Sequence, residues 1–146
     1  MIALVQRVAH AAVQVDSKCV GAIERGLLVF VCAEPEDSEV QADKLVDKLL
    51  KLRIFADDAG KMNRSVRDVA GGLLVVSQFT LAADTRSGNR PSFTGAAPAA
   101  LAQAMYEAVL RLARERHATV ASGVFGADMQ VSLLNDGPVT IPLRVV

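Results

Sequence analysis

Apolar residues recur along the chain with two periods, one typical of strands and one typical of helices. Residues 2–15 and 20–33 are rich in valine, isoleucine and alanine and flank a polar stretch at 16–18, which predicts N-terminal antiparallel strands joined by a turn. Residues 53–55 predict a short strand that enters a turn. Gly26 punctuates the second of the long runs, and residues 27–31 predict a buried strand. Residues 73–81, which follow a pair of glycines, predict another buried strand.

The C-terminal part of the chain has the clearest strand pattern. Apolar residues alternate with polar ones over residues 129–133 and again over residues 139–145, and an Asp-Gly pair lies between the two runs. Because Asp-Gly is a common hairpin signal, we expect two strands connected by a turn. Pro142 indicates that the last strand lies at an edge of the sheet, since proline has no amide hydrogen to donate.

Two segments have the period of an amphipathic helix. Ser38 and Gln41 have the three-residue spacing of a capping box, and the apolar residues that follow predict a helix over residues 38–52. A second helix is expected to begin near Pro98, because proline suits the first helical turn. With no repeat or linker, the pattern predicts a single α+β domain over residues 1–146. Its mainly antiparallel sheet curls towards a barrel, and two helices pack on it.

The composition narrows the class of protein. With 51% hydrophobic and 22% charged residues in 146 positions, the chain can form its own core, which excludes a disordered protein. The longest apolar run, residues 27–33, is far shorter than the roughly 18 to 20 residues that span a bilayer. Gln6 and Arg7 interrupt the N-terminal apolar stretch, and no cleavage site follows it, so no signal peptide is predicted. We expect a cytoplasmic protein without a membrane partner.

Charge, cysteine and histidine content limit the chemistry further. Cys19, Cys32, His10 and His117 are too few and too far apart for a disulfide framework or a zinc site, so we expect no metal and no disulfide. No phosphate-binding or dinucleotide motif is present, and no cofactor is expected. Sixteen basic residues balance sixteen acidic ones, which argues against binding to DNA or any other duplex through many phosphates. A nucleic-acid partner would have to be held locally.

The first candidate site is the stretch Ser77-Gln78-Phe79-Thr80-Leu81. On a strand, Gln78 and Thr80 would lie on one face and present a polar pair to a ligand. The alternative, which the residues alone favour, is a half-buried strand whose hydroxyl groups bond locally.

Two further polar segments are candidates. Taken alone, Asn135-Asp136-Gly137-Pro138-Val139-Thr140 is a turn between strands, and the sequence leaves the Gly-Pro bond open between cis and trans. Residues 84–93 form a polar loop whose Arg86 and Arg90 could contact phosphate. Exposed loop arginines without a function are the alternative.

Together these segments resemble the D-aminoacyl-tRNA deacylases, a family marked by an SQxxL and an NxGPxT motif. Residues 77–81 match the first motif and residues 135–140 match the second. The resemblance implies a homodimeric hydrolase that cleaves the ester between a D-amino acid and the terminal adenosine of tRNA. Such an enzyme proofreads the charging of tRNA for translation. The similarity also covers Gln6-Arg7-Val8, residues 52–55, Asp57, Gly60-Lys61, residues 88–93, residues 125–127 and residues 129–131.

The resemblance also implies roles for individual residues. A cis Gly137-Pro138 bond would reach into the pocket of the partner subunit, where its backbone would exclude L-amino acids but not glycine. Gln78, Phe79 and Thr80 would form the catalytic segment, with backbone N–H groups stabilising the oxyanion. We expect water to attack with help from the terminal ribose hydroxyl, while a Thr80 nucleophile remains the alternative. Arg7 would brace Gly137-Pro138. Phe125, Gly126 and Met129 would hold the adenine. The other expected substrate-binding residues are Ser77, Leu81, Asn135 and Thr140.

Two other functions remain open at this stage. The lack of an evident nucleophile and base is compatible with a module that binds the tRNA 3′ end without hydrolysis. A related deacylase with a trans Gly-Pro bond and relaxed chirality is the second alternative.

Overall fold

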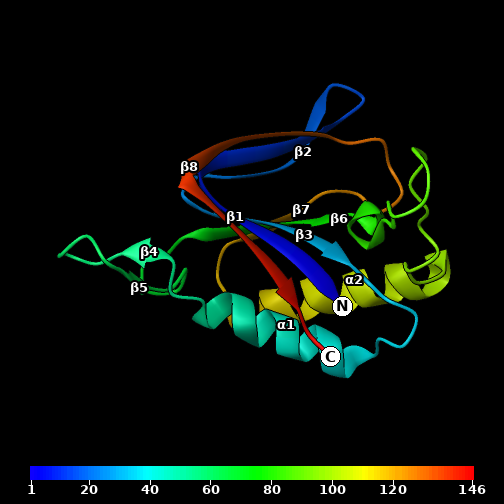
Figure 1. Ribbon diagram of the computed structural model, residues 1–146. Helices are drawn as coiled ribbons and strands as arrows, with labels where there is room; N and C mark the ends of the chain where they lie inside the picture. The colour runs from blue at the N-terminus through cyan, green and yellow to red at the C-terminus, as the bar shows by residue number, and fades with distance from the viewer.

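The computed structural model describes all residues 1–146, which form one main sheet, a small hairpin and two helices on one side of the sheet (Figure 1). The elements in chain order are β1 (Ile2–Val15), β2 (Lys18–Ile23), β3 (Gly26–Cys32), α1 (Glu39–Lys51), β4 (Phe55–Ala56), β5 (Met62–Arg64), β6 (Gly72–Ser77), the 3-10 helix η1 (Phe79–Ala82), α2 (Ala99–Arg116), β7 (Val120–Ser122) and β8 (Gln130–Arg144).

Strand β1 organises the main sheet. It pairs antiparallel with β2, β3 and β8, while β3 pairs parallel with β6 and β6 pairs parallel with β7. The sheet curls until its ends approach, so that a Cβ on Gly21 of β2 would lie 2.3 Å from the Ser122 oxygen of β7. The expected α+β fold with a mainly antiparallel, barrel-like sheet and two packed helices is therefore confirmed.

The curled sheet separates two apolar cores. The larger one lies between the sheet and the two helices and includes Val5, Val29 and Leu45. The smaller one lies inside the curl and includes Val8 and Leu28. Both faces of β3 are buried, which explains why its sequence is apolar without alternation.

Both helices begin where the sequence indicated. The Ser38 hydroxyl accepts a hydrogen bond from the Val40 amide, and the Gln41 side chain accepts one from the Ser38 amide. Pro98 is the N-terminal cap of α2. Neither helix has the length and apolar content that crossing a membrane requires.

The apolar run over residues 20–33 forms the two strands β2 and β3, which meet near Gly26 as its position in the run indicated. One strand prediction was wrong in extent. The strand predicted over residues 73–81 ends at Ser77, and residues 79–82 form the 3-10 helix η1. Gln78 and Thr80 are therefore not neighbours on a strand face.

The predicted C-terminal hairpin was also wrong. Both halves belong to the single strand β8, which runs antiparallel to β1 along its whole length and pairs with no other strand. Thr140 lies opposite Gln6 and Asn135 lies opposite Val8, so the four residues 136–139 bulge out opposite one residue of β1. Asp-Gly here marks a bulge, because the chain resumes pairing with the same neighbour beyond it. The edge position that Pro142 indicated is confirmed.

Candidate active site

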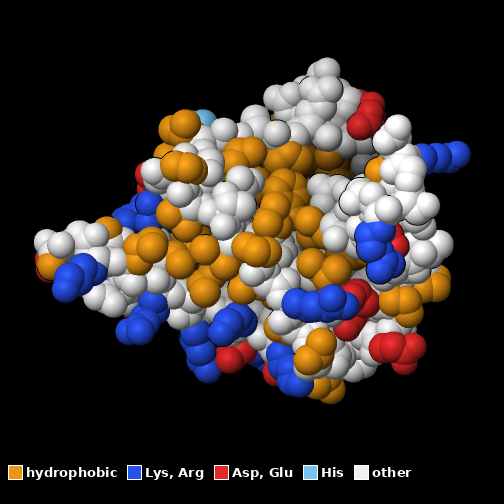
Figure 2. Space-filling model, viewed as in Figure 1, with side chains coloured by type: hydrophobic (Ala, Val, Ile, Leu, Met, Phe, Trp, Pro, Cys, Tyr) orange, Lys and Arg blue, Asp and Glu red, His pale blue; other side chains and the backbone are white.

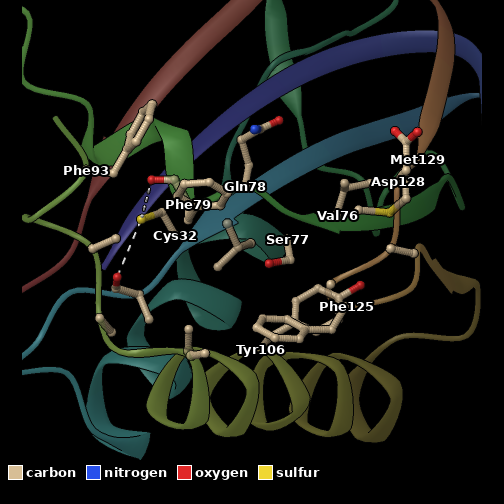
Figure 3. Close-up of a pocket in the computed structure, with 18 of the residues that line it drawn as sticks. Cys32, Val76, Ser77, Gln78, Phe79, Phe93, Tyr106, Phe125, Asp128 and Met129 are labelled. Atoms are coloured by element: carbon tan, nitrogen blue, oxygen red, sulfur yellow. Dashed lines mark hydrogen bonds between the residues drawn. The ribbon is translucent and has the colours of Figure 1, made fainter. Parts of the chain in front are cut away.

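A cavity of about 550 Å³ lies where the parallel strands β3 and β6 end, and most of the residues that line it are hydrophobic (Figure 3). Ser77, Gln78 and Phe79 of the first motif line it, and so do Phe125, Gly126 and Met129. The structure thus brings together residues about 50 positions apart that the resemblance assigned to one pocket. Thr80 and Leu81 follow the lining residues in η1 and do not line the cavity themselves.

Two aromatic pairs form opposite sides of the cavity (Figure 3). The rings of Phe79 and Phe93 meet edge to face with their centroids 5.2 Å apart, and the two residues are 56% and 37% exposed. The rings of Tyr106 and Phe125 lie 6.0 Å apart at an angle of 40°. An exposed aromatic pair at the mouth and a second pair deeper in the cavity suit a flat or apolar ligand.

The turn from β6 into η1 positions the catalytic candidates. The Gln78 amide donates to the Val31 oxygen at 2.8 Å, so the end of β6 remains attached to β3. The Gln78 Nε2 group donates to the Thr80 hydroxyl at 2.5 Å. The main-chain N–H groups of Phe79 and Thr80 begin a 3-10 helix, where no preceding turn supplies an acceptor inside the helix.

The 123–129 loop forms another side of the cavity. The Met129 sulfur accepts a hydrogen bond from the Val124 amide at 3.4 Å, which closes the loop on itself. A Cβ on Gly123 would lie 2.5 Å from that sulfur, so only glycine allows this approach. Gly126 has a φ of +76°, which favours glycine at the loop's sharpest turn.

Cys32 and Tyr106 are cavity residues that the sequence analysis missed. The Cys32 side chain is buried, and its thiol donates weakly to the main-chain oxygen of Phe79 at 3.5 Å (Figure 3). Burial raises the pKa of Cys32, so the thiol stays protonated. In the sequence both residues look like ordinary core positions, one of a strand and one of a helix, and only the packing of β3 and α2 beside the cavity reveals their place.

Ionisable groups are scarce in the cavity. Besides Cys32 and Tyr106, only Asp128 among the lining residues can ionise. His10 lies exposed on β1, and the His117 ring is hydrogen-bonded to the Gly71 oxygen at 2.6 Å, so neither histidine reaches the cavity. No three His, Cys, Asp or Glu side chains come together to hold a metal ion.

The second motif contains the β8 bulge, defined as residues 136–139, and the two paired residues that flank it. Arg7 supports it through Nε, which donates to the Asp136 oxygen at 3.1 Å, and through Nη1, which donates to the Ile54 oxygen at 2.7 Å. The Gly137-Pro138 bond is cis, and both residues are exposed.

Asn135 and Thr140 hold the two ends of the β8 bulge together. The Asn135 side-chain amide donates to the main-chain oxygens of Arg7 and Val139, both at 3.0 Å. The Thr140 hydroxyl donates to Asn135 Oδ1 at 3.4 Å and accepts from Gln6 Nε2 at 3.2 Å. These two residues therefore support the bulge and lie away from the cavity lining.

The two motifs lie at opposite ends of the sheet within one chain (Figure 1). Arg7, next to the bulge, pairs with Leu27 at the start of β3, whereas Cys32 at the end of β3 lines the cavity. Five residues of strand separate these positions, a distance of about 17 Å at roughly 3.4 Å per residue. A single chain does not bring Gly137-Pro138 to the cavity.

The polar loop at 84–93 contributes Phe93 to the cavity but neither arginine. Arg86 is held by the Asp84 carboxylate, with nitrogen–oxygen distances of 2.9 and 2.6 Å, and this interaction lowers the pKa of Asp84. Arg90 is exposed and forms no ion pair. Of the two predicted phosphate contacts, only Arg90 has a free guanidinium group.

Comparison with known proteins places the chain in a family. Residues 4–144 match the family model described as D-Tyr-tRNA(Tyr) deacylase. A protein named D-aminoacyl-tRNA deacylase from Methylibium petroleiphilum is 66% identical over 145 residues, which cover 99% of this chain and 95% of that protein. Another of that name from Aromatoleum aromaticum is 64% identical over 100% of this chain and 96% of its own.

Solved structures have the same fold. The structure described as c-Myc DNA Unwinding Element Binding Protein matches with a TM-score of 0.95 and 40% identity over 100% of this chain and 99% of its own. A structure described as a probable eukaryotic D-amino acid tRNA deacylase matches with a TM-score of 0.85 at 17% identity, over 99% and 98% of the two chains.

The chain therefore belongs to the D-Tyr-tRNA(Tyr) deacylase family, and the resemblance carried by its two motifs is confirmed. As a member of this family it is an enzyme, a hydrolase that acts on ester bonds.

Proposed function

We propose that this protein hydrolyses the ester bond of D-aminoacyl-tRNA and releases the free D-amino acid and reusable tRNA. The observation that carries the proposal is the cavity that residues 77–79 share with Phe125, Gly126 and Met129. It lies beside the motif that the resemblance assigns to catalysis. In this proposal the whole chain forms one deacylase domain. Because the proposed substrate is a tRNA, we expect the protein to act in the cytoplasm.

The cavity suits the aminoacylated adenosine at the tRNA 3′ end. Its volume of about 550 Å³ lies within the range of roughly 300 to 1,000 Å³ that small-molecule sites occupy. Phe125 supplies an aromatic face for the adenine, with Gly126 and Met129 beside it. The aminoacyl ester would then lie towards Ser77, Gln78 and Phe79.

The chemistry that we propose relies on positioned backbone groups and water. The N–H groups of Phe79 and Thr80 would stabilise the negative charge that develops on the ester oxygen. The Thr80 hydroxyl bonds to an amide, which does not take up a proton at neutral pH, so no base is placed to activate it as a nucleophile. Water attack assisted by the terminal ribose hydroxyl therefore fits this arrangement better.

A homodimer would complete the site. The exposed β8 bulge lies near the start of β3, and the cavity lies at the other end of that strand, about 17 Å along it, so Gly137-Pro138 would act on an aminoacyl group in another copy of the chain. The sheet face turned away from the helices carries the apolar row Pro142, Leu4 and Phe30, none of them fully buried. Hydrophobic side chains gather in Figure 2 where β1 and β8 run in Figure 1. This apolar surface supports pairing of two copies.

Chiral selection would follow from the backbone of Gly137 and Pro138. In the partner's cavity these two residues would bind the α-amino group through their carbonyl oxygens and leave no room for an L side chain. Glycine has no side chain to clash and would be accepted. Arg7 would keep this backbone in place through its hydrogen bond to Asp136.

The tRNA backbone would be held by few contacts. Arg90 is exposed and unpaired at the loop that supplies Phe93, so it is the better candidate for a phosphate contact. Arg86 would first have to leave Asp84. A formal net charge of zero agrees with local binding rather than with an extended nucleic-acid surface.

The test is a deacylation assay with purified protein on D-tyrosyl-tRNA and L-tyrosyl-tRNA. Hydrolysis of the D-ester with the L-ester left intact is expected. Binding of D-tyrosyl-tRNA without turnover would instead identify a tRNA 3′-end binding module. Equal hydrolysis of both esters would identify a deacylase with relaxed chirality.

A further inference from the structure

The main-chain oxygen of Val75 joins three parts of the cavity wall. It accepts a hydrogen bond from the Tyr106 hydroxyl at 2.8 Å and another from the Gly123 amide at 3.1 Å. Tyr106 belongs to α2, Val75 to β6, and Gly123 to the start of the 123–129 loop. A carbonyl oxygen has two lone pairs, so both bonds form at the same time.

The Tyr106 hydroxyl lies in a mostly enclosed environment. The residue is 5% exposed, and burial raises the pKa of Tyr106, while Ser122, the charge of Arg114 and the Gly123 backbone oppose this rise. The hydroxyl is therefore neutral and serves as a hydrogen-bond donor to Val75. Losing a buried hydrogen bond of this kind leaves an acceptor less well satisfied and weakens the local structure.

The ring of Tyr106 also faces the cavity. It lies 6.0 Å from the ring of Phe125, and the two labelled side chains lie side by side above α2 in Figure 3. Phe125 follows Gly123 by two residues, so the same loop that Val75 anchors also presents this ring. The hydroxyl and the first amide of the loop thus share one acceptor on β6, and the ring lies beside the Phe125 ring of the same loop.

We propose that Tyr106 is a positioning residue for the terminal adenosine of the substrate, which it serves by holding the 123–129 loop and the Phe125 ring in place. The inference rests on the proposed function, because it assigns the adenine to Phe125. It adds a residue of α2 to a site that the first motif and the 123–129 loop otherwise form.

Steady-state kinetics with matched variants tests the role. Tyr106→Phe keeps the ring and removes the hydroxyl, and we expect KM for D-aminoacyl-tRNA to rise about fivefold with kcat nearly unchanged, the scale of one hydrogen bond. Tyr106→Leu removes the ring as well and should raise KM further. The control is Val109→Ala, a buried position of α2 that does not line the cavity, which should lower the melting temperature without changing KM.

Tyrosine fluorescence supplies a second readout, because Tyr106 is the only tyrosine and the chain has no tryptophan. Titration of the wild-type protein with adenosine monophosphate should give a saturable change in emission, and cytidine monophosphate should give a weaker one. In the Phe125→Ala variant the response should be lost.

The outcomes separate this inference from the proposed function. If the wild type cleaves D-aminoacyl-tRNA while Tyr106→Phe leaves KM unchanged and adenosine monophosphate leaves the emission unchanged, the role of Tyr106 is refuted and the proposed function stands. If the emission responds but no D-ester is cleaved, the nucleotide site stands and the proposed function fails.

Discussion

Arg7 and Asp136 join strand β1 to the β8 bulge through a hydrogen bond of 3.1 Å from Nε to the main-chain oxygen. The same guanidinium group donates to the main-chain oxygen of Ile54, so one side chain connects β1, the bulge and the residue just before β4. The Arg7 side chain is 14% exposed, and its ion pair with Asp136 spans 3.5 Å. Arg7 therefore supports the backbone that we assign to chiral selection.

Arg7→Ala is expected to lower kcat/KM for D-aminoacyl-tRNA by tenfold or more, because the bulge loses its hydrogen bonds and no longer holds one position. Hydrogen bonds to charged groups contribute about 1.5 to 3 kcal/mol each, which corresponds to at least a tenfold effect. The matched control is Arg64→Ala, which removes an exposed ion pair with Asp58 and should leave activity unchanged. Full activity of Arg7→Ala would show that the bulge needs no support.

Mixed dimers test whether the β8 bulge serves the partner's cavity. One variant combines Phe79→Ala with Phe125→Ala and loses its cavity walls. The other is Gly137→Ala, whose added Cβ would lie 2.8 Å from an Arg7 nitrogen at a φ of +127°. Each variant alone should be nearly inactive.

An equal mixture of the two variants, unfolded and refolded together, should recover about one quarter of the wild-type activity. Half of the dimers would then be mixed, and each would have one site built from an intact cavity and an intact bulge. A mixture as inactive as its components, with mixed dimers present by mass spectrometry, would contradict the shared site.

Thr80→Ala should retain substantial activity, within about tenfold of the wild type, because backbone donors and water carry the proposed chemistry. The measurement is the first-order rate constant of hydrolysis under single-turnover conditions, with circular dichroism as the control for folding. A loss of about 10⁴-fold, the scale on which removal of a catalytic-triad residue acts, would identify an essential hydroxyl. A trapped aminoacyl ester of Thr80 would establish it as the nucleophile.

The two cysteines should differ in reactivity. The thiolate is the reactive form, and burial raises the pKa of Cys32, so a smaller fraction of this thiol is ionised at any given pH than for an ordinary thiol. Iodoacetamide near pH 8 should therefore modify the exposed Cys19 first, which peptide mass spectrometry can follow. Faster modification of Cys32 would mean that the cavity opens more than the structure indicates.

Much of the fold could be predicted from local patterns. The capping box at Ser38 and Gln41 gave the start of α1, and the apolar stretch over residues 2–15 is one strand. The strand predicted through residue 81 ended early, because the chain turns after the bond from the Gln78 amide to β3 while the apolar pattern continues into η1. The spacing of apolar residues alone does not distinguish a strand from the 3-10 helix that follows it.

The candidate site was predictable only in part. The two motifs pointed to residues 77–81 and 135–140, but the local pattern predicted a hairpin at the second. The chain pairs with β1 both before and after the bulge, and this long-range pairing leaves no local signal. Tyr106 and Cys32 carry no local signal, since each looks like any other core position of a helix or strand. Their place beside the cavity depends on how β3, β6 and α2 pack.

The most direct test of the account compares D-alanyl, L-alanyl and glycyl esters on matched tRNA at one enzyme concentration. Exclusion by the Gly137-Pro138 backbone predicts rapid cleavage of the D-alanyl and glycyl esters and survival of the L-alanyl ester. Each tenfold of discrimination corresponds to about 1.4 kcal/mol, and a steric clash can supply several such factors against an L side chain but none against glycine. Survival of the glycyl ester at enzyme levels that clear the D-alanyl ester would contradict exclusion and show that the pocket recognises the D side chain itself.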